Sequence, residues 1–181
     1  SGNVAIGCRS LDSNTTGSTN TAIGGGTMRA TTTQTENTAV GSTALNGNTG
    51  NCNTGIGASA LENVTGDSNT AVGRRALYLN TSGTENVAVG SGALDSNTTA
   101  GCNTSIGHGS MGDNTEGANN AAVGRNALGS NTTGASNVAV GRNSLTLNTT
   151  AIGNTATGAF ALDKNTTGAN NVGVGWQLSL I

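Results

Sequence analysis

The stretch Asn86-Val-Ala-Val-Gly90, continued by Ser91-Gly-Ala-Leu94 and Asn97-Thr-Thr-Ala100, decides the fold of this chain. It belongs to a 17-residue unit that reads N-[TV]-A-[VI]-G-x-x-[AS]-L-x-x-N-T-T-G-x-x, whose places we number as positions 1 to 17. Successive units are 17 residues apart, except for two spacings of 16 after Asn37 and Asn53. A fixed period of this kind predicts a repeat architecture rather than an ordinary globular core. Eleven units begin at Asn3, Asn20, Asn37, Asn53, Asn69, Asn86, Asn103, Asn120, Asn137, Asn154 and Asn171.

Some positions are fixed and others vary freely. Glycine occupies position 5 in every unit, positions 3 and 8 are small, position 4 is valine or isoleucine with one exception, and position 9 is leucine or methionine in the first ten units. Positions 6 and 7 vary without pattern and are predicted to face solvent. Fixed positions should face the core or need a special backbone, and we expect them to form structural ladders that include Asn3, Gly7, Asn20, Gly24, Asn37 and Gly41.

The unit is predicted to be one coil of a parallel β-solenoid. Asn-Thr-Ala-Val-Gly is a short β-branched strand closed by glycine, and Asn-Thr-Thr-Gly is turn or second-strand chemistry in which asparagine and glycine tolerate positive φ. So much glycine and asparagine would break helices. We therefore expect residues 1–181 to form a single all-β domain, a β-roll of about eleven coils, with the valine/isoleucine and leucine columns filling a thin interior. The first residues are already in register with the repeat, so we read the chain as part of a longer fibre.

Composition limits the function classes. Charged residues make up 9% of the chain, aromatic residues 2%, and the formal net charge is −2. With seven basic residues the chain has no electrostatic footprint for nucleic acid. No apolar run approaches the roughly 20 residues that span a bilayer, so membrane insertion is not expected. Because each coil has few large apolar groups to bury, we predict lateral association into a homo-oligomer, with a monomeric solenoid as the alternative.

The five-residue cores Asn86 to Gly90, Asn137 to Gly141 and Asn3 to Gly7 resemble the Ser/Asn-Val-Ala-Ile-Gly signature of trimeric autotransporter adhesin heads. The longer N-T-A-[VI]-G-x-x-A-L-x-x-N-T-T-G form resembles repeats of phage and bacterial tail-fibre proteins. The resemblance covers nearly the whole chain. It implies a left-handed β-roll, a homotrimer and an extracellular place on a cell or virion surface. The 17-residue period and the added Asn-Thr-Thr-Gly arm depart from the adhesin heads, whose coils are nearer 14 residues, and this leaves the handedness open.

No enzyme chemistry is expected, and no metal or other cofactor. His108 is the only histidine, so histidine triads and multi-histidine metal sites are excluded within one chain. The glycine-aspartate pattern of calcium-binding β-rolls is absent. Cys52 and Cys102 lie three coils apart, about 14 Å along the axis and too far for a disulfide, and no Cys-x-x-Cys exists. With Cys8 they are expected to be unpaired surface residues, or else to link chains.

The leading functional hypothesis is a structural and adhesive extracellular fibre module, which acts as a stiff spacer and an attachment surface for a host receptor or glycan. Its exposed side chains with the strongest chemistry are Arg74, Arg75, His108, Arg125, Arg142 and Trp176. Alternatively, Trp176 with Leu178, Leu180 and Ile181 packs against a following domain or caps the stack of coils.

Two alternatives concern the ends and one face of the solenoid. The first is a filament subunit that self-assembles by stacking its end coils on neighbouring molecules. The second is an ice-binding protein that presents the position-13 threonine column, Thr15, Thr32, Thr49, Thr65, Thr81, Thr98, Thr115, Thr132, Thr149 and Thr166.

Overall fold

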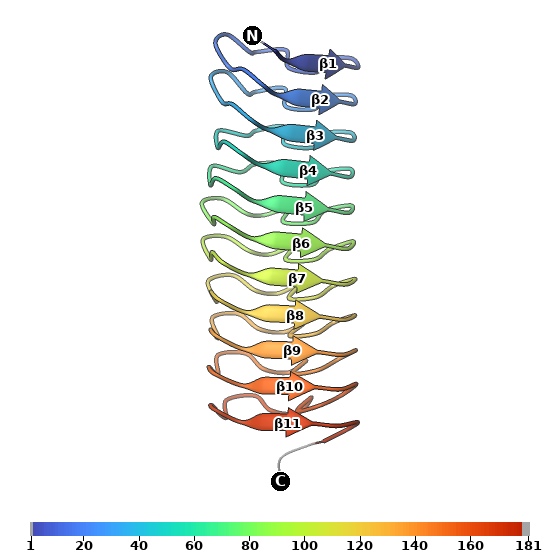
Figure 1. Ribbon diagram of the computed structural model, residues 1–181, viewed down its shortest axis with the longest axis vertical. Helices are drawn as coiled ribbons and strands as arrows, with labels where there is room; N and C mark the ends of the chain where they lie inside the picture. Colours follow the sequence, from blue (N-terminus) through green and yellow to red (C-terminus); the bar gives the residue numbers. More distant parts are fainter. Residues whose placement is uncertain (1, 179–181) are drawn as a thin grey trace.

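The structure, a computed structural model, describes residues 2–178, and it confirms an all-β parallel solenoid. Each unit contributes one three-residue strand to a single eleven-stranded parallel sheet, in which each strand lies beside the strands that precede and follow it in the chain (Figure 1). The strands are β1 (Val4–Ile6), β2 (Thr21–Ile23), β3 (Thr38–Val40), β4 (Thr54–Ile56), β5 (Thr70–Val72), β6 (Val87–Val89), β7 (Thr104–Ile106), β8 (Ala121–Val123), β9 (Val138–Val140), β10 (Thr155–Thr157) and β11 (Val172–Val174).

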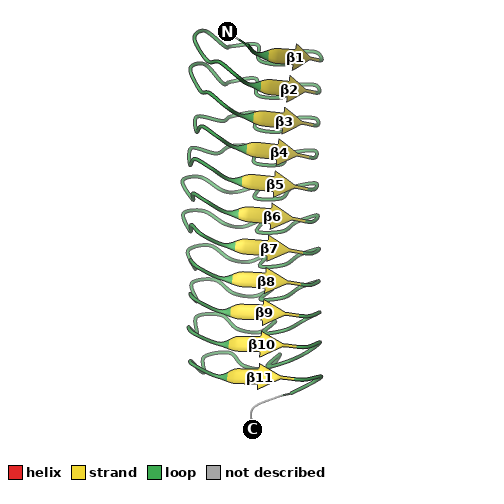
Figure 2. Cartoon of the chain, in the orientation of Figure 1, coloured by secondary structure: helices red, strands yellow, loops and turns green. Residues whose placement is uncertain are grey.

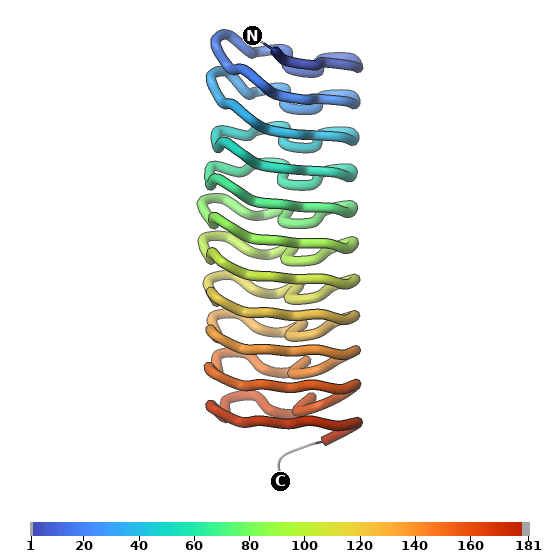
Figure 3. Tube along the Cα trace, in the orientation of Figure 1, coloured from blue at the N-terminus to red at the C-terminus, as the bar shows by residue number. Residues whose placement is uncertain are grey.

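The path of each coil is a strand followed by a return arm without further strands (Figure 2). In Figure 1 the strands run left to right at the front, the arms return behind, and each circuit ends one level lower, so the coil is left-handed. Figure 3 shows the same stack as a continuous rod with the coils of β1 and β11 at opposite ends. With about 4.8 Å between neighbouring strands, the rod is roughly 50 Å long.

Strand register is fixed unit by unit, so equal positions lie above one another. Ala5 pairs with Ala22, and Ala22 pairs with Ala39. The two 16-residue coils do not shift this register, because Thr38 still pairs with Thr54 and Thr54 with Thr70. The missing residue is position 14 of the return arm, far from the sheet. Coil length is therefore adjustable in the arm and not in the strand.

The interior is narrower than the sequence predicts. Its apolar part consists of small residues at positions 3 and 8 and the leucine or methionine of position 9, as in Ala88, Ala93 and Leu94, all fully buried. The prediction that valine and isoleucine of position 4 fill the core is wrong, since Ile56 is 39% and Ile106 40% exposed. Side chains alternate across a strand. Alanine at position 3 therefore points inward, and positions 2 and 4 point outward.

Two columns of buried asparagines replace the missing apolar volume. At position 1, Oδ1 of each asparagine accepts the backbone N–H of the next asparagine, and Nδ2 donates to the position-15 carbonyl of its own coil, as in Asn20 to Asn37 and Asn20 to Gln34. At position 12 the amides bond directly to one another, with Nδ2 of Asn97 donating to Oδ1 of Asn80 at 2.8 Å. Direct bonds between amides also occur at some places of the position-1 column, but they are more regular at position 12.

The position-5 glycines, including Gly7, Gly24 and Gly41, are required twice over. Their φ angles are +124°, +139° and +130°, and a Cβ there would lie 2.5 to 2.7 Å from atoms of the glycine in the next coil. The position-15 glycines, in contrast, do not have the positive φ that the sequence predicts. Gly83, for example, is buried beside Asn80 Oδ1 and the Ala100 carbonyl of the next coil, which leave no room for a Cβ.

Positive φ falls instead on non-glycine residues at positions 7, 9 and 17, such as Arg75, Leu77 and Glu85, with φ of 57°, 51° and 58°. Each such residue costs roughly 1–2 kcal/mol of conformational energy. Backbone hydrogen bonds between coils offset the cost, because Leu77 donates its N–H to the Ala93 carbonyl at 3.0 Å and Glu85 donates to Asp67 at 3.2 Å.

Candidate functional site

The outer face of the sheet is a uniform surface that runs along the rod. From β1 to β11 its positions 2 and 4 hold only threonine, valine, isoleucine and alanine, without one charge. Valines of this face remain open to solvent, with Val138 37% and Val140 39% exposed. Eleven strands about 4.8 Å apart and three residues wide cover roughly 500 Å². Surface patches of about this size are often functional, so the sheet face is a candidate interaction surface.

A second surface is the edge formed by positions 6 and 7, where the sequence places six candidate contact residues. All six are exposed, as predicted: Arg74, Arg75, His108, Arg125, Arg142 and Trp176. His108, Arg125 and Arg142 occupy position 6 of three successive coils and so form one column. Arg74 and Arg75 lie in the coil of β5, two coils before His108, and Trp176 lies two coils beyond Arg142, so the six do not form one cluster. Whether any of them binds a ligand stays a prediction.

Two of these arginines are held by neighbouring coils. Arg75 forms an ion pair with Asp95 at 3.1 Å, and its guanidinium lies 4.4 Å from the ring centre of Tyr78. Arg142 lies 4.7 Å from the ring centre of Phe160 in the next coil. These contacts fix the two guanidinium groups on the surface and give them a structural part between coils.

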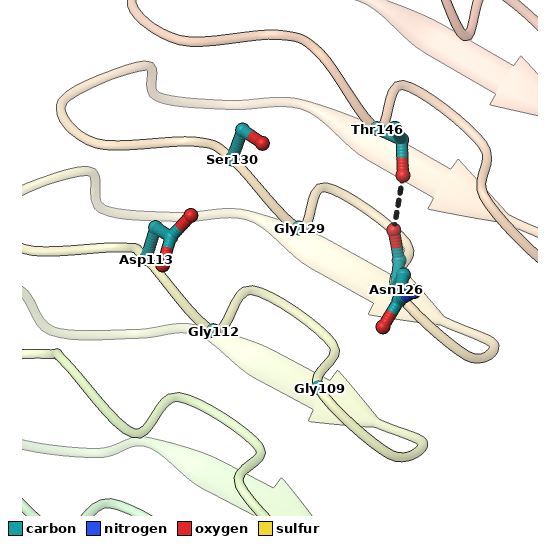
Figure 4. A pocket seen from close by; sticks show the side chains of 7 residues that line it. All are labelled: Gly109, Gly112, Asp113, Asn126, Gly129, Ser130 and Thr146. Atoms are coloured by element: carbon teal, nitrogen blue, oxygen red, sulfur yellow. Dashed lines mark hydrogen bonds between the residues drawn. The ribbon is translucent and has the colours of Figure 1, made fainter.

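A groove of about 340 Å³ lies where coils 7, 8 and 9 meet, the coils that begin at Asn103, Asn120 and Asn137 (Figure 4). Sequence reasoning missed it, although one signal was available: position 10 is glycine only in coils 7 and 8 and carries a side chain in the other complete coils. The residues that line it are Gly109, Gly112, Asp113, Asn126, Gly129, Ser130 and Thr146.

A second, more basic groove of about 430 Å³ lies near the first coils. Arg9 and Arg29 flank it, and the adjacent glycines Gly25 and Gly26 leave it open. Like the first groove, it follows from glycine at positions that carry side chains in most other coils. Its lining residues are Cys8, Arg9, Gly25, Gly26, Arg29, Ser42, Thr43 and Asn46.

The three cysteines are unpaired within the chain and exposed, as predicted: Cys8, Cys52 and Cys102. Two of them repeat one local arrangement at position 17. The Sγ of Cys52 donates to Glu36 and that of Cys102 to Glu85, each at 3.4 Å and one coil apart. The hydrogen bond to the carboxylate raises the pKa of both thiols above the ordinary value. Both side chains are therefore held in the unreactive thiol form at neutral pH.

Most position-13 threonines donate their hydroxyls to a backbone carbonyl of the next coil. Oγ1 of Thr81, for example, donates to the Thr98 carbonyl of the next coil at 2.9 Å, and Oγ1 of Thr98 donates to Thr115 at 3.1 Å. The threonines of position 2 lie on the sheet face, and within residues 2–178 their hydroxyls form no hydrogen bond with the protein. They are Thr21, Thr38, Thr54, Thr70, Thr104 and Thr155.

Two further properties bear on the kind of site. Among the described residues, no three histidine, cysteine, aspartate or glutamate side chains gather where a metal ion could be held. The same part of the chain contains no helix with the length and apolarity needed to cross a bilayer. Leu180 and Ile181, considered above as partners of Trp176, lie outside the described residues.

The surfaces of the rod are therefore an uncharged sheet face, an edge that carries arginines, and two grooves. Comparison of the chain with protein-family models, with curated proteins and with solved structures found no match in any of the three.

Proposed function

We propose that this chain is a structural and adhesive module of an extracellular fibre, in which it acts as a stiff spacer and an attachment surface on a cell or virion. The observation that carries the proposal is the unbroken register from β1 to β11. Every coil is bonded to the next through the strand, the buried asparagines and the return arm, so bending the rod would break several hydrogen bonds at once.

Lateral association through the sheet face supports the same role. The face of roughly 500 Å² has the size of patches that are often functional, and two such faces bury about 1,000 Å², the lower limit of a specific interface. Position-4 residues such as Val89, Ile106 and Val140 would supply the apolar contacts. The oligomer that we propose is a homotrimer, on the resemblance of the Asn-Val-Ala-Val-Gly cores to adhesin heads.

Molecular mass and shape in solution test this proposal. Analytical ultracentrifugation should give three times the 17.5 kDa chain mass, and small-angle scattering should give a rod about 50 Å long. Val89→Lys together with Val140→Lys should release monomers that keep the β-sheet circular dichroism spectrum. The matched control, Arg125→Ser on the edge, should leave the mass unchanged. A monomer in the unaltered protein would contradict lateral association.

Filament formation by end-to-end stacking is the second candidate. It is favoured by the equivalence of the coils, since β1 and β11 each have one strand neighbour within this chain and an equivalent free edge. Electron microscopy separates the two candidates, because open-ended filaments support stacking and discrete short rods support the fibre module.

Ice binding remains a third candidate, but on a different face from the one that the sequence suggests. Free hydroxyls lie at position 2, in rows about 4.8 Å apart beside the position-4 methyl groups, whereas many position-13 hydroxyls already donate to carbonyls. Thermal hysteresis that Thr54→Lys abolishes would support it, and its absence at high protein concentration would remove it.

A further inference from the structure

Three polar side chains that border the groove on coils 7 to 9 have no hydrogen-bond partner among the described residues. Within residues 2–178, the carboxylate of Asp113, the amide of Asn126 and the hydroxyl of Ser130 form no hydrogen bond with protein atoms. Figure 4 shows Asp113 and Ser130 along one side, Asn126 and Thr146 along the other. Three polar groups from neighbouring coils thus border the same space.

The glycines between them are not explained by the backbone. Neither Gly112 nor Gly129 has a positive φ, and the nearest atom to an added Cβ would be 3.4 Å away at Gly112 and 3.2 Å at Gly129. Other coils carry aspartate, tyrosine or threonine at this position, including Asp95 and Thr146. Two successive glycines therefore open a space that the repeat fills elsewhere.

The side chain of Asn126 lies where the neighbouring coil leaves room for it. Its Oδ1 lies over Gly109, where a Cβ would approach it to 2.8 Å, so the glycine makes room for the side chain. The backbone carbonyl of Asn126 accepts the Thr146 hydroxyl at 2.7 Å, which joins two coils at the end of the groove. The donor and acceptor of this amide are therefore free to bind a ligand.

We propose that this groove binds a neutral saccharide through Asp113, Asn126 and Ser130. A sugar presents neighbouring hydroxyls, each of which both donates and accepts, and these groups match a carboxylate that accepts, an amide that does both and a hydroxyl that does both. The carboxylate disfavours anionic ligands, and no large apolar side chain lines the groove to pack against a lipid or an aromatic group. Its volume is at the lower end of the roughly 300–1,000 Å³ of ligand pockets and suits one or two hexose rings. The inference rests on the attachment role proposed above and names the ligand class.

Saturation-transfer NMR on the intact rod tests the inference, with the methyl glycosides of glucose, galactose, mannose and N-acetylglucosamine as probes at millimolar concentration. At least one glycoside should receive saturation. Asp113→Ser and Gly129→Thr copy residues that the next coil carries at the same positions, so both variants should fold, and each should weaken binding about tenfold or more through a lost charged hydrogen bond or a filled groove.

A third test variant, Asn126→Gly, has Asn143→Gly as its matched control. Both substitutions place at position 7 a glycine, which accepts the positive φ found there. Only Asn126→Gly should weaken binding, because Asn143 does not line the groove. No signal with any probe, equal binding by the variants, or stronger binding of the anionic sugar N-acetylneuraminic acid would overturn the inference. Rods that self-associate but bind no sugar would overturn the saccharide proposal and leave lateral association intact. Monomers that bind sugar would contradict lateral association and leave the saccharide proposal intact.

Discussion

Oδ1 of Asn86 accepts the backbone N–H of Asn103 at 3.0 Å, and Nδ2 of the same side chain donates to the Ala100 carbonyl at 2.8 Å. One buried amide thus closes its own coil and joins it to the next. The same geometry recurs along the rod. Hydrogen bonds of this asparagine column therefore stabilise the interior, as apolar packing does in proteins with a thicker core.

Replacement of this amide should therefore destabilise the rod. Asn86→Ala leaves the buried N–H of Asn103 without a partner and should lower the free energy of unfolding by about 2–3 kcal/mol. Chemical denaturation followed by circular dichroism measures the change. Thr99→Ala, at an exposed position of the same coil, is the control and should change stability by less than about 0.5 kcal/mol. Equal stability of the two variants would argue against the asparagine column.

Two glycines of one coil should respond differently to alanine. At Gly90, φ is +136° and a new Cβ would lie 2.5 Å from the Gly107 carbonyl oxygen, so Gly90→Ala should cost about 3 kcal/mol or more. At Gly92, φ is +67° with nothing within 4 Å, so Gly92→Ala should cost only about 1 kcal/mol. Thermal melting of both variants checks the order, and a reversed order would mean that the glycine corners do not stack.

One defect in the position-12 column can be repaired. Oδ1 of Asn14 is buried without a partner because the next coil carries Thr31 instead of asparagine. Thr31→Asn supplies the missing donor and should stabilise the protein by about 1 kcal/mol.

The matched control for this repair is Val64→Asn, since the acceptor below it, Asn48 Oδ1, already receives Gly50 N–H and Asn53 Nδ2. This substitution should bring no gain and buries an extra polar group. A stabilised Val64→Asn beside an unchanged Thr31→Asn would contradict the assignment of the partners.

Cysteine reactivity should depend on the neighbouring glutamates. The carboxylate of Glu85 raises the pKa of Cys102, so less thiolate is present at a given pH. In a variant with Cys102 as the sole thiol, Glu85→Gln should lower that pKa and speed alkylation by iodoacetamide at mildly alkaline pH. The alkylation profile against pH should move to lower pH. The pair Glu36 and Cys52 provides an independent copy of the test, and an unchanged profile in both would show that the carboxylates do not act on the thiols.

Sequence periodicity was enough to predict the coil, its strand and the glycine corners. Residues that recur once per coil stack on the equivalent residues of the neighbouring coils, so the pattern reflects what each position of the coil requires. Periodicity failed to predict that Val89 and the other position-4 residues face outward. A residue type can recur in every coil because it faces the core or because it faces another surface, and the sequence pattern is the same in both cases. It also failed for Leu77, whose positive φ no propensity would suggest and which inter-coil hydrogen bonds impose. The groove could not be predicted because it follows from departures such as Gly112 and Gly129, which a consensus averages away.

The coils that begin at Asn37 and Asn53 are one residue short, yet β3, β4 and β5 remain paired in step. Strand pairing therefore depends on each coil completing one turn, and it does not depend on whether that coil has 16 or 17 residues. Duplication or loss of a whole repeat in the gene would lengthen or shorten the rod by about 4.8 Å and leave every other coil with an equivalent neighbour. The reach of the fibre is therefore a property that recombination can tune in small, equal steps.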